Sequence, residues 1–332
     1  MLKPNMLAAC ILASAVVSGQ ASALNIVLTN DDSWHTANIQ VMFSALKAAG
    51  HNVIMSAPCT GQSGKGGAVS FLKPVKVDNT KATENQYCVG DTDTTKPFAS
   101  YVEGTPIMAA LQGIDIAAHA TWGKAPDLLI SGPNEGNNLG YLNNSSGTLG
   151  AAMIAIIRGI PAIAVSAADG DAEKAPKVAQ IIVDLIQTLE SERQANQPLL
   201  PPFMGLNVNT PADIDNHRGI KFTQVGWNSG LDVVFRKNLG QDPSAIGYVA
   251  QGIMAAKGVD KATAEQMAIQ MLMDRSGISI SRGEDLVKDN ADDSEGVALY
   301  QGYVTISTID AQIQASQAKA ALTQLKLHKL TQ

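Results

Sequence analysis

The sequence predicts an α/β fold: three layers, α/β/α, with a mostly parallel sheet between two layers of helices. Short apolar runs typical of buried strands alternate with segments whose apolar residues recur at helical spacing, and this β-α-β rhythm is typical of parallel sheets. The 332 residues are 45% hydrophobic and include 29 glycines, which suits a large, closely packed core.

The first half of the chain shows this alternation most clearly. Strands are expected at residues 24–28, 53–55, 127–130, 162–165 and 204–208. Helices are expected around residues 39–46, 148–158 and 178–189, the first two ending at Gly50 and Gly159. Ligands of such sheets bind at the carboxyl ends of the strands, where the polar clusters of this chain fall.

After Pro211 the rhythm changes, and we separate a core of residues 24–215 from a C-terminal part of residues 216–332. Strands are expected there at residues 220–225 and 303–306, with a terminal helix at 312–325. An Ala- and Met-rich helix is expected at 262–275, with a capping box formed by Thr263 and Gln266.

The N-terminus, residues 1–23, has the anatomy of an export signal. Lys3 precedes a short apolar run at residues 7–17, and Ala21-Ser22-Ala23 is a small-residue cleavage site, so the mature chain is expected to begin at Leu24. A lipoprotein signal acylated at Cys10 is the alternative. We therefore expect a periplasmic or secreted protein without a membrane span.

Net charge and cysteine usage narrow the possible partners. The full chain carries a formal charge of −6, and loss of Lys3 leaves −7, which disfavours binding to nucleic-acid duplexes or anionic membranes. Cys59 and Cys88 remain after processing, and two cysteines in an exported chain most simply form one disulfide.

Asn30, Asp31 and Asp32 end the first predicted strand. Two adjacent carboxylates at a strand end repel each other unless a cation neutralises them, so the pair indicates a metal site. An Asx turn before a helix is the alternative.

Two further polar segments follow predicted strands or begin helices. Residues 131–140 hold three asparagines and three glycines, which suits close backbone approach to a ligand. Residues 145–148 lead into a helix whose free amides could hold phosphate, although an ordinary N-cap has the same composition. The glycine-rich segment 61–67 does not fit a Walker A loop.

In combination, these segments resemble the SurE (stationary-phase survival protein) family of nucleotidases. The resemblance covers residues 24–230 and 293–310. Its motifs lie at residues 28–32, 57–58, 63–64, 104–106, 131–140, 146–152, 207–209 and 302–306.

The resemblance implies a Rossmann-like core that hydrolyses nucleoside 5′- and 3′-monophosphates with one divalent cation per subunit, in a homo-oligomer (dimer or tetramer). The implied metal ligands are Asp31, Asp32, Ser63 and Asn134; all offer oxygen, which independently suits Mg²⁺ or Mn²⁺, with Ca²⁺ as a third candidate. The groups expected to bind phosphate and substrate are Asn30, Ser131, Gly132, Asn138, Ser146, Gly147 and Thr148. Asp31 and His35 are the candidate catalytic residues.

The chain departs from the family pattern at three places. Ser33 stands where the family usually has Gly, and Ser294-Glu295 replaces the usual Thr-Asp. Residues 231–292 form a divergent insertion with no clear counterpart.

Two other interpretations are open. A haloacid-dehalogenase-type phosphatase would use Asp91 as nucleophile and Asp93 as general acid, but residues 86–90 make a poor preceding strand. A periplasmic anion-binding protein without chemistry would share the helix starts, yet it would not need paired carboxylates beside them.

Overall fold

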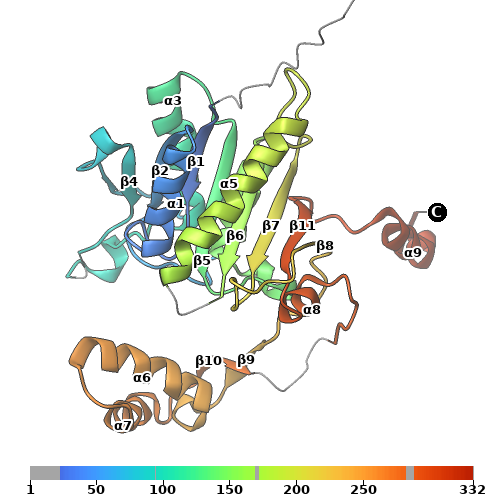
Figure 1. The fold of residues 1–332 in the computed structure, drawn as a ribbon. Helices are drawn as coiled ribbons and strands as arrows, with labels where there is room; N and C mark the ends of the chain where they lie inside the picture. Colours follow the sequence, from blue (N-terminus) through green and yellow to red (C-terminus); the bar gives the residue numbers. More distant parts are fainter. Residues whose placement is uncertain (1–22, 94, 169–171, 282–287, 332) are drawn as a thin grey trace, which may run out of the picture.

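The computed structural model describes residues 23–93, 95–168, 172–281 and 288–331. Their architecture is a three-layer α/β/α arrangement around a nine-stranded sheet, which confirms the predicted fold class (Figure 1). The predicted signal peptide, residues 1–23, and Cys10 lie outside the described residues, apart from Ala23. Within the described ranges, no helix is both long and apolar enough to cross a bilayer.

The central sheet is mostly parallel, in the spatial order β3-β4-β2-β1-β5-β6-β7-β11-β8. The consecutive strands β4, β2, β1, β5, β6 and β7 run parallel to one another. At the two sides of this group, β3 runs antiparallel to β4, and β11 runs antiparallel to β7. The strands are β1 (Asn25–Thr29), β2 (Asn52–Pro58), β3 (Val77–Asp78), β4 (Gln86–Val89), β5 (Leu128–Glu135), β6 (Ala162–Ala167), β7 (Met204–Thr210), β8 (Ile220–Thr223) and β11 (Val304–Asp310).

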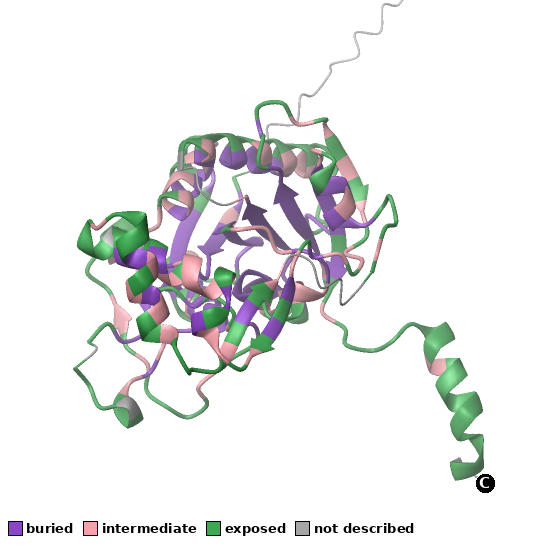
Figure 2. Cartoon of the chain, turned by 90° about the horizontal axis from the view of Figure 1, so that it is seen from below, coloured by how far each residue is buried: buried purple, intermediate pink, exposed green. Residues whose placement is uncertain are grey.

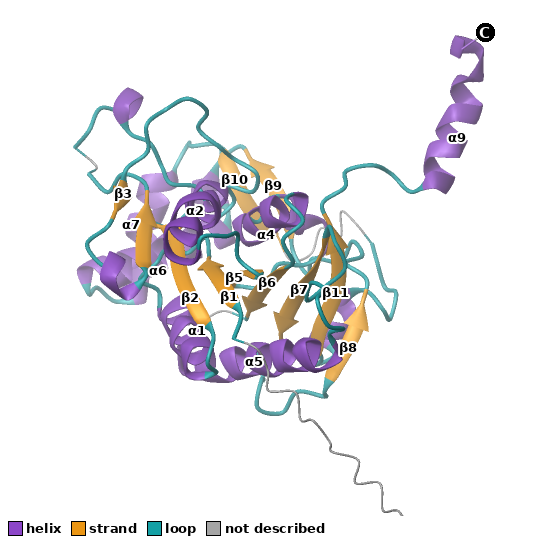
Figure 3. Ribbon diagram, turned by 90° about the horizontal axis from the view of Figure 1, so that it is seen from above, coloured by secondary structure: helices purple, strands orange, loops and turns teal. Residues whose placement is uncertain are grey.

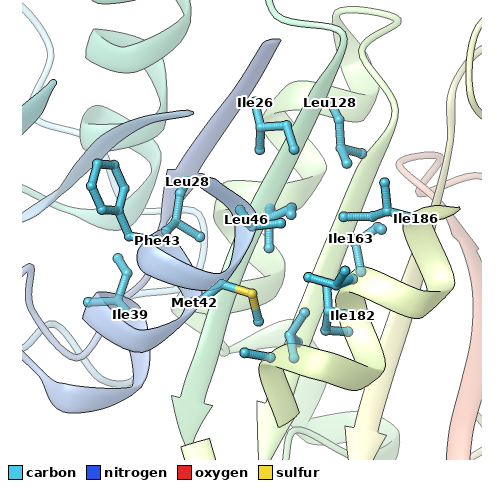
Figure 4. Packing of buried hydrophobic residues seen from close by; sticks show 14 of the residues in the cluster. Ile26, Leu28, Ile39, Met42, Phe43, Leu46, Leu128, Ile163, Ile182 and Ile186 are labelled. Atoms are coloured by element: carbon cyan, nitrogen blue, oxygen red, sulfur yellow. The ribbon is translucent and has the colours of Figure 1, made fainter. Parts of the chain in front are cut away.

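Helices cover both faces of the sheet (Figure 3). On one face α1 (Ala37–Ala48) and α5 (Ala175–Glu192) pack their apolar stripes against β1, β5 and β6 (Figure 4). On the other face lie α4 (Gly147–Ile157) and a continuous helical stretch made of α2 (Pro106–Leu111), the π-helical η3 (Gln112–Ala117) and α3 (Ala118–Trp122). The wide apolar seam on each helix is what burial on a sheet requires.

Part of the sheet comes from the C-terminal part of the chain. β11 pairs with β7, and β8 pairs with β11 at the edge, so one sheet crosses the boundary that we placed at residue 215. The helix α8 (Glu295–Tyr300) precedes β11 along the chain. The last helix, α9 (Gln317–Leu327), stands away from the body and buries none of its residues (Figure 2).

The insertion forms a separate small unit beyond the carboxyl ends of the central strands (Figure 1). It contains the antiparallel pair β9 (Asp232–Arg236) and β10 (Gly277–Ser281), and the helices α6 (Pro243–Lys257) and α7 (Lys261–Leu272). Ala250 and Ile253 of α6 pack against Ala264 and Ala268 of α7, which gives the unit its own small core.

Two local expectations are wrong. Residues 86–89 do form a strand, β4, because pairing with β2 buries a segment whose own apolar content is low. The N-cap of α7 is Asp260, whose carboxylate accepts from the backbone amide of Thr263 at 3.0 Å, so the expected capping box at Thr263 does not form.

Cys59 and Cys88 are joined in a disulfide between the ends of β2 and β4, as expected. The bridge ties the chain just before the loop that carries Ser63.

Replacing both cysteines by alanine should lower the free energy of unfolding by about 3 kcal/mol, because the bridge closes a loop across a sequence separation of 29 and so restricts the unfolded chain. Urea denaturation of the two proteins measures the difference. Two freely alkylated thiols in the native, unreduced protein would contradict the bridge.

Candidate active site

Polar side chains from separate segments meet at the carboxyl edge of the central sheet. Asp31 and Asp32 directly follow β1, Ser63 lies in the loop after β2, and Asn134 lies near the end of β5. Because β2, β1 and β5 are adjacent parallel strands, their carboxyl ends share one edge. A cavity of about 860 Å³ opens at this edge, and Asp31, Ser63 and Asn134 line it.

The carboxyl group of Asp31 is buried against the first turn of α4, with 3% of the residue exposed. Thr148 donates a hydrogen bond from Oγ1 to Asp31 Oδ1 at 2.7 Å. A Cβ atom on Gly147 would lie 2.6 Å from Asp31 Cβ and 2.9 Å from its Oδ2, so this close approach needs glycine. Burial raises the pKa of Asp31, and the hydrogen bond from Thr148 opposes that rise.

Asp32 and Asn134 are brought together by the irregular end of β5. The backbone amide of Glu135 donates to Asp32 Oδ2 at 2.8 Å, and Asn134 Nδ2 donates to the carbonyl oxygen of Gly136 at 2.6 Å. The register of β5 against β6 shifts between Ser131 and Asn134. A bulge of this kind re-aims side chains, and here it directs Asn134 to the cavity.

Three of the four predicted ligands, Asp31, Ser63 and Asn134, line the cavity, whereas Asp32 does not. The oxygen chemistry of the set fits a hard divalent cation. The Nδ2 group of Asn134 is committed to Gly136, so its amide oxygen is the group left to serve as a ligand. Two carboxylates, a hydroxyl and an amide oxygen suit Mg²⁺, Mn²⁺ or Ca²⁺ better than Zn²⁺. In the described part of the chain, no group of three or more His, Cys, Asp or Glu side chains is placed to hold a metal.

The start of α4 lies beside Asp31 and presents the backbone amides of its first turn. Ser146 is its N-cap and accepts from the amide of Leu149, while Gly147 and Thr148 are the first helical residues. Asn138 Nδ2 donates to Thr148 Oγ1 at 3.2 Å and to Ser166 Oγ at 2.9 Å. Asn138 and Ser146 line the cavity, so phosphate there would meet the positive end of the helix.

Five of the residues expected at the phosphate are buried and do not line the cavity, namely Asn30, Ser131, Gly132, Gly147 and Thr148. Asn30 is fully buried and bonds to Ser33 and Thr36, so it shapes the loop. Ser131 is fully buried, and its Oγ has no hydrogen-bond partner among the described residues. Gly132 adopts φ 122°, and a Cβ there would lie 2.1 Å from the carbonyl oxygen of Val165, so it permits the bulge.

His35 is not placed at the cavity. Its side chain is exposed, and its Nε2 accepts a hydrogen bond from Trp34 Nε1 at 2.9 Å. The cavity lining does not include it. The structure therefore gives the predicted catalytic role of His35 no geometric support.

Asp91 and Asp93 do not form a second phosphatase site. Asp91 pairs with Lys96 and accepts from the amide of Val102 at 3.0 Å, and these bonds lower its pKa. Asp93 accepts from the amide of Thr95. Both carboxylates are engaged in their own loop, and neither lines the cavity.

Sequence reasoning missed the role of Glu295. Its fully buried carboxylate accepts hydrogen bonds from the amide of Gly140 and from Asn143, Asn207 and Ser307, at 2.9–3.0 Å. Asn207 also donates to the carbonyl oxygen of Asn138, so Glu295 supports the loop beside the phosphate end. Burial raises the pKa of Glu295 to about 7, although the four hydrogen bonds to its carboxylate act to lower it. The only signal in the sequence was its place in the altered Thr-Asp motif.

Ser33, the other departure, has φ 121°, a backbone conformation that favours glycine. The structure holds a serine there because Ser33 Oγ donates to the carbonyl oxygen of Cys59 at 3.2 Å and Asn30 and Thr36 bond to the Ser33 carbonyl. The loop path is thus kept at a cost in backbone strain.

The fold and the site together define an α/β protein with a polar, oxygen-lined cavity at the carboxyl edge of its sheet. The family model described as Survival protein SurE matches residues 26–231. The chain belongs to this family.

Similar proteins agree with that assignment. A 5′-nucleotidase SurE of Aquifex aeolicus is 32% identical over 211 residues, which are 63% of this chain and 74% of that protein. An acid phosphatase of Yarrowia lipolytica is 35% identical over 221 residues, and the match spans 61% of each chain, under two thirds of the phosphatase. The crystal structure of the SurE protein from Aquifex aeolicus has the same fold, with a TM-score of 0.63, 24% identity, and coverage of 91% of this chain and 99% of that one.

Ser33→Ala should lower the free energy of unfolding by about 1 kcal/mol, because it loses the bond to Cys59 and keeps the strain. Ser33→Gly loses the same bond but relieves the strain, so it should be more stable than Ser33→Ala by about 1 kcal/mol. Urea denaturation ranks the two variants. An alanine variant as stable as the glycine variant would show that position 33 is unstrained.

Glu295 should make stability depend on pH. Its pKa is raised from 4.5 to about 7 on folding, so the stabilisation it gives is complete below pH 4.5 and is lost as pH rises to 7. The loss is on the order of 3 kcal/mol. Glu295→Gln cannot titrate, so its free energy of unfolding should fall less over this range. Parallel pH curves for the two proteins would contradict the assignment.

Proposed function

We propose that this chain is a divalent-metal-dependent phosphomonoesterase that hydrolyses nucleoside 5′- and 3′-monophosphates to nucleoside and phosphate. One observation carries the proposal: Asp31, the first of two adjacent carboxylates, lines the cavity with Ser63 and Asn134 and bonds to the first turn of α4. A protein that only binds anions would not need paired carboxylates beside the phosphate, because like charges repel each other. The names of the relatives, 5′-nucleotidase and acid phosphatase, support the same reaction class.

The ligands Asp31, Asp32, Ser63 and Asn134 would hold Mg²⁺ or Mn²⁺, with Ca²⁺ as a third candidate. When bound, such an ion supplies positive charge that offsets the negative charge of the phosphate oxygens in the transition state. Thr148 orients the Asp31 carboxylate toward the site through its hydrogen bond. The free amides at the start of α4 would bind and orient the phosphate group.

We also propose that the mature protein begins at Leu24 and works in the periplasm or outside the cell, since a cleavable signal and a disulfide fit an oxidising compartment. Resemblance to the family favours a dimer or tetramer.

Metals and substrates are tested together by a phosphate-release assay on 5′- and 3′-monophosphates. Chelator should silence the enzyme, and Mn²⁺ or Mg²⁺ added singly should restore it. Turnover that survives complete chelation would contradict the metal requirement.

Asp32→Asn should lower kcat/KM at least about 100-fold, because it removes a ligand charge while keeping the volume of the side chain. Asn134→Ala should cost a similar factor, and combining the two should add little, since ligands of one ion act as a unit.

Asp91→Asn is the matched control, because Asp91 is also a carboxylate that follows a parallel strand but does not line the cavity. It should leave kcat/KM within about twofold of the wild type. Loss of turnover in Asp91→Asn with full turnover in Asp32→Asn would instead support the haloacid-dehalogenase-type mechanism.

A further inference from the structure

The insertion supplies an apolar wall to the cavity. Val233 of β9 and Ile280 of β10 lie directly opposite each other in the register of this hairpin, and both line the cavity. Their exposed fractions are 39% and 41%. Both residues lie outside the range matched by the family model, 26–231.

The alternation of the hairpin explains why these side chains face the cavity. Asp232, Val234 and Ser279 are buried, so they turn to one face of the hairpin, whereas Val233 and Ile280 turn to the other. On the buried face, Ser279 Oγ donates to the carboxylate of Asp242 at 2.6 Å. The apolar pair is therefore fixed in its outward orientation by the register of the strands.

The wall is also fixed relative to the phosphate end of the cavity. Tyr141 Oη accepts from the backbone amide of Val233 at 3.1 Å and donates to Asp232 Oδ1 at 3.3 Å. Tyr141 belongs to η4 (Gly140–Asn144), the short helix that leads into α4. The short segment from η4 to α4 thus connects the wall to the helix start where phosphate would bind.

The size and chemistry of the cavity call for a substrate with an apolar part. A volume of about 860 Å³ is far more than a phosphate group needs and lies in the range of sites that enclose drug-sized ligands. A flat aromatic ring laid on Val233 and Ile280 would remove their apolar surface from water.

We propose that Val233 and Ile280 form a subsite for the planar base of the nucleotide, so that the insertion sets the preference for nucleotides over phosphomonoesters without a base. This inference rests on the proposed nucleotidase function.

The experiment compares adenosine 5′-monophosphate with ribose 5-phosphate, which is the same phosphomonoester without the base. The double variant Val233→Thr with Ile280→Thr keeps β-branched side chains and the backbone bond to Tyr141 but makes the wall polar. Its kcat/KM for adenosine 5′-monophosphate should fall about tenfold, mainly through KM, while kcat/KM for ribose 5-phosphate stays unchanged.

The control pair lies one step along the same face. Phe235 and Ile278 are also opposite each other and are 70% and 62% exposed, but they do not line the cavity. Phe235→Thr with Ile278→Thr should leave both substrates unaffected. An equal loss in the control pair, an equal loss on both substrates, or no loss on the nucleotide overturns the subsite alone. Wild-type protein that hydrolyses neither substrate overturns the proposed function as well.

Discussion

The buried carboxylate of Asp31, pressed against the first turn of α4, is the contact on which the rest of the site depends. A carboxylate taken out of water needs compensation, which Thr148 and the helix N-terminus supply in part. The contact also constrains the sequence of α4, because a side chain at position 147 would collide with Asp31. The remaining negative charge, with Asp32 beside it, explains why a cation completes the arrangement.

The C-terminal part of the chain is tied to the same site. Glu295, at the start of α8, bonds to the loop at Gly140 and to Asn207 of β7, and Asn207 bonds to Asn138, which bonds to Thr148. These links join residues up to 155 positions apart. Strand β11 therefore does more than extend the sheet, because the helix before it braces the phosphate end. The site depends on the whole sheet and not only on the loops of the first half.

The alternation of strands and helices predicted the parallel sheet, whose strand ends bring Asp31, Ser63 and Asn134 to one edge, whereas the choice of these residues as metal ligands came from the resemblance to the family. It could not predict β4, whose apolar content is low, or the insertion hairpin, whose partners are set by tertiary contacts. Asn30 and Ser131 were expected at the phosphate, but both are fully buried, and position along a strand end does not reveal depth. The contacts of Glu295 span distances in sequence at which periodicity carries no information.

Binding of Mn²⁺ to the purified protein, followed by electron paramagnetic resonance, tests the central claim most directly, because it needs no substrate and no turnover. The wild type should bind one Mn²⁺ per chain. Asp31→Asn, which removes the buried charge at nearly constant volume, should weaken binding at least about tenfold, while Asp91→Asn should bind as the wild type does. Equal affinity in the wild type and Asp31→Asn, or loss of binding in Asp91→Asn, would contradict the account.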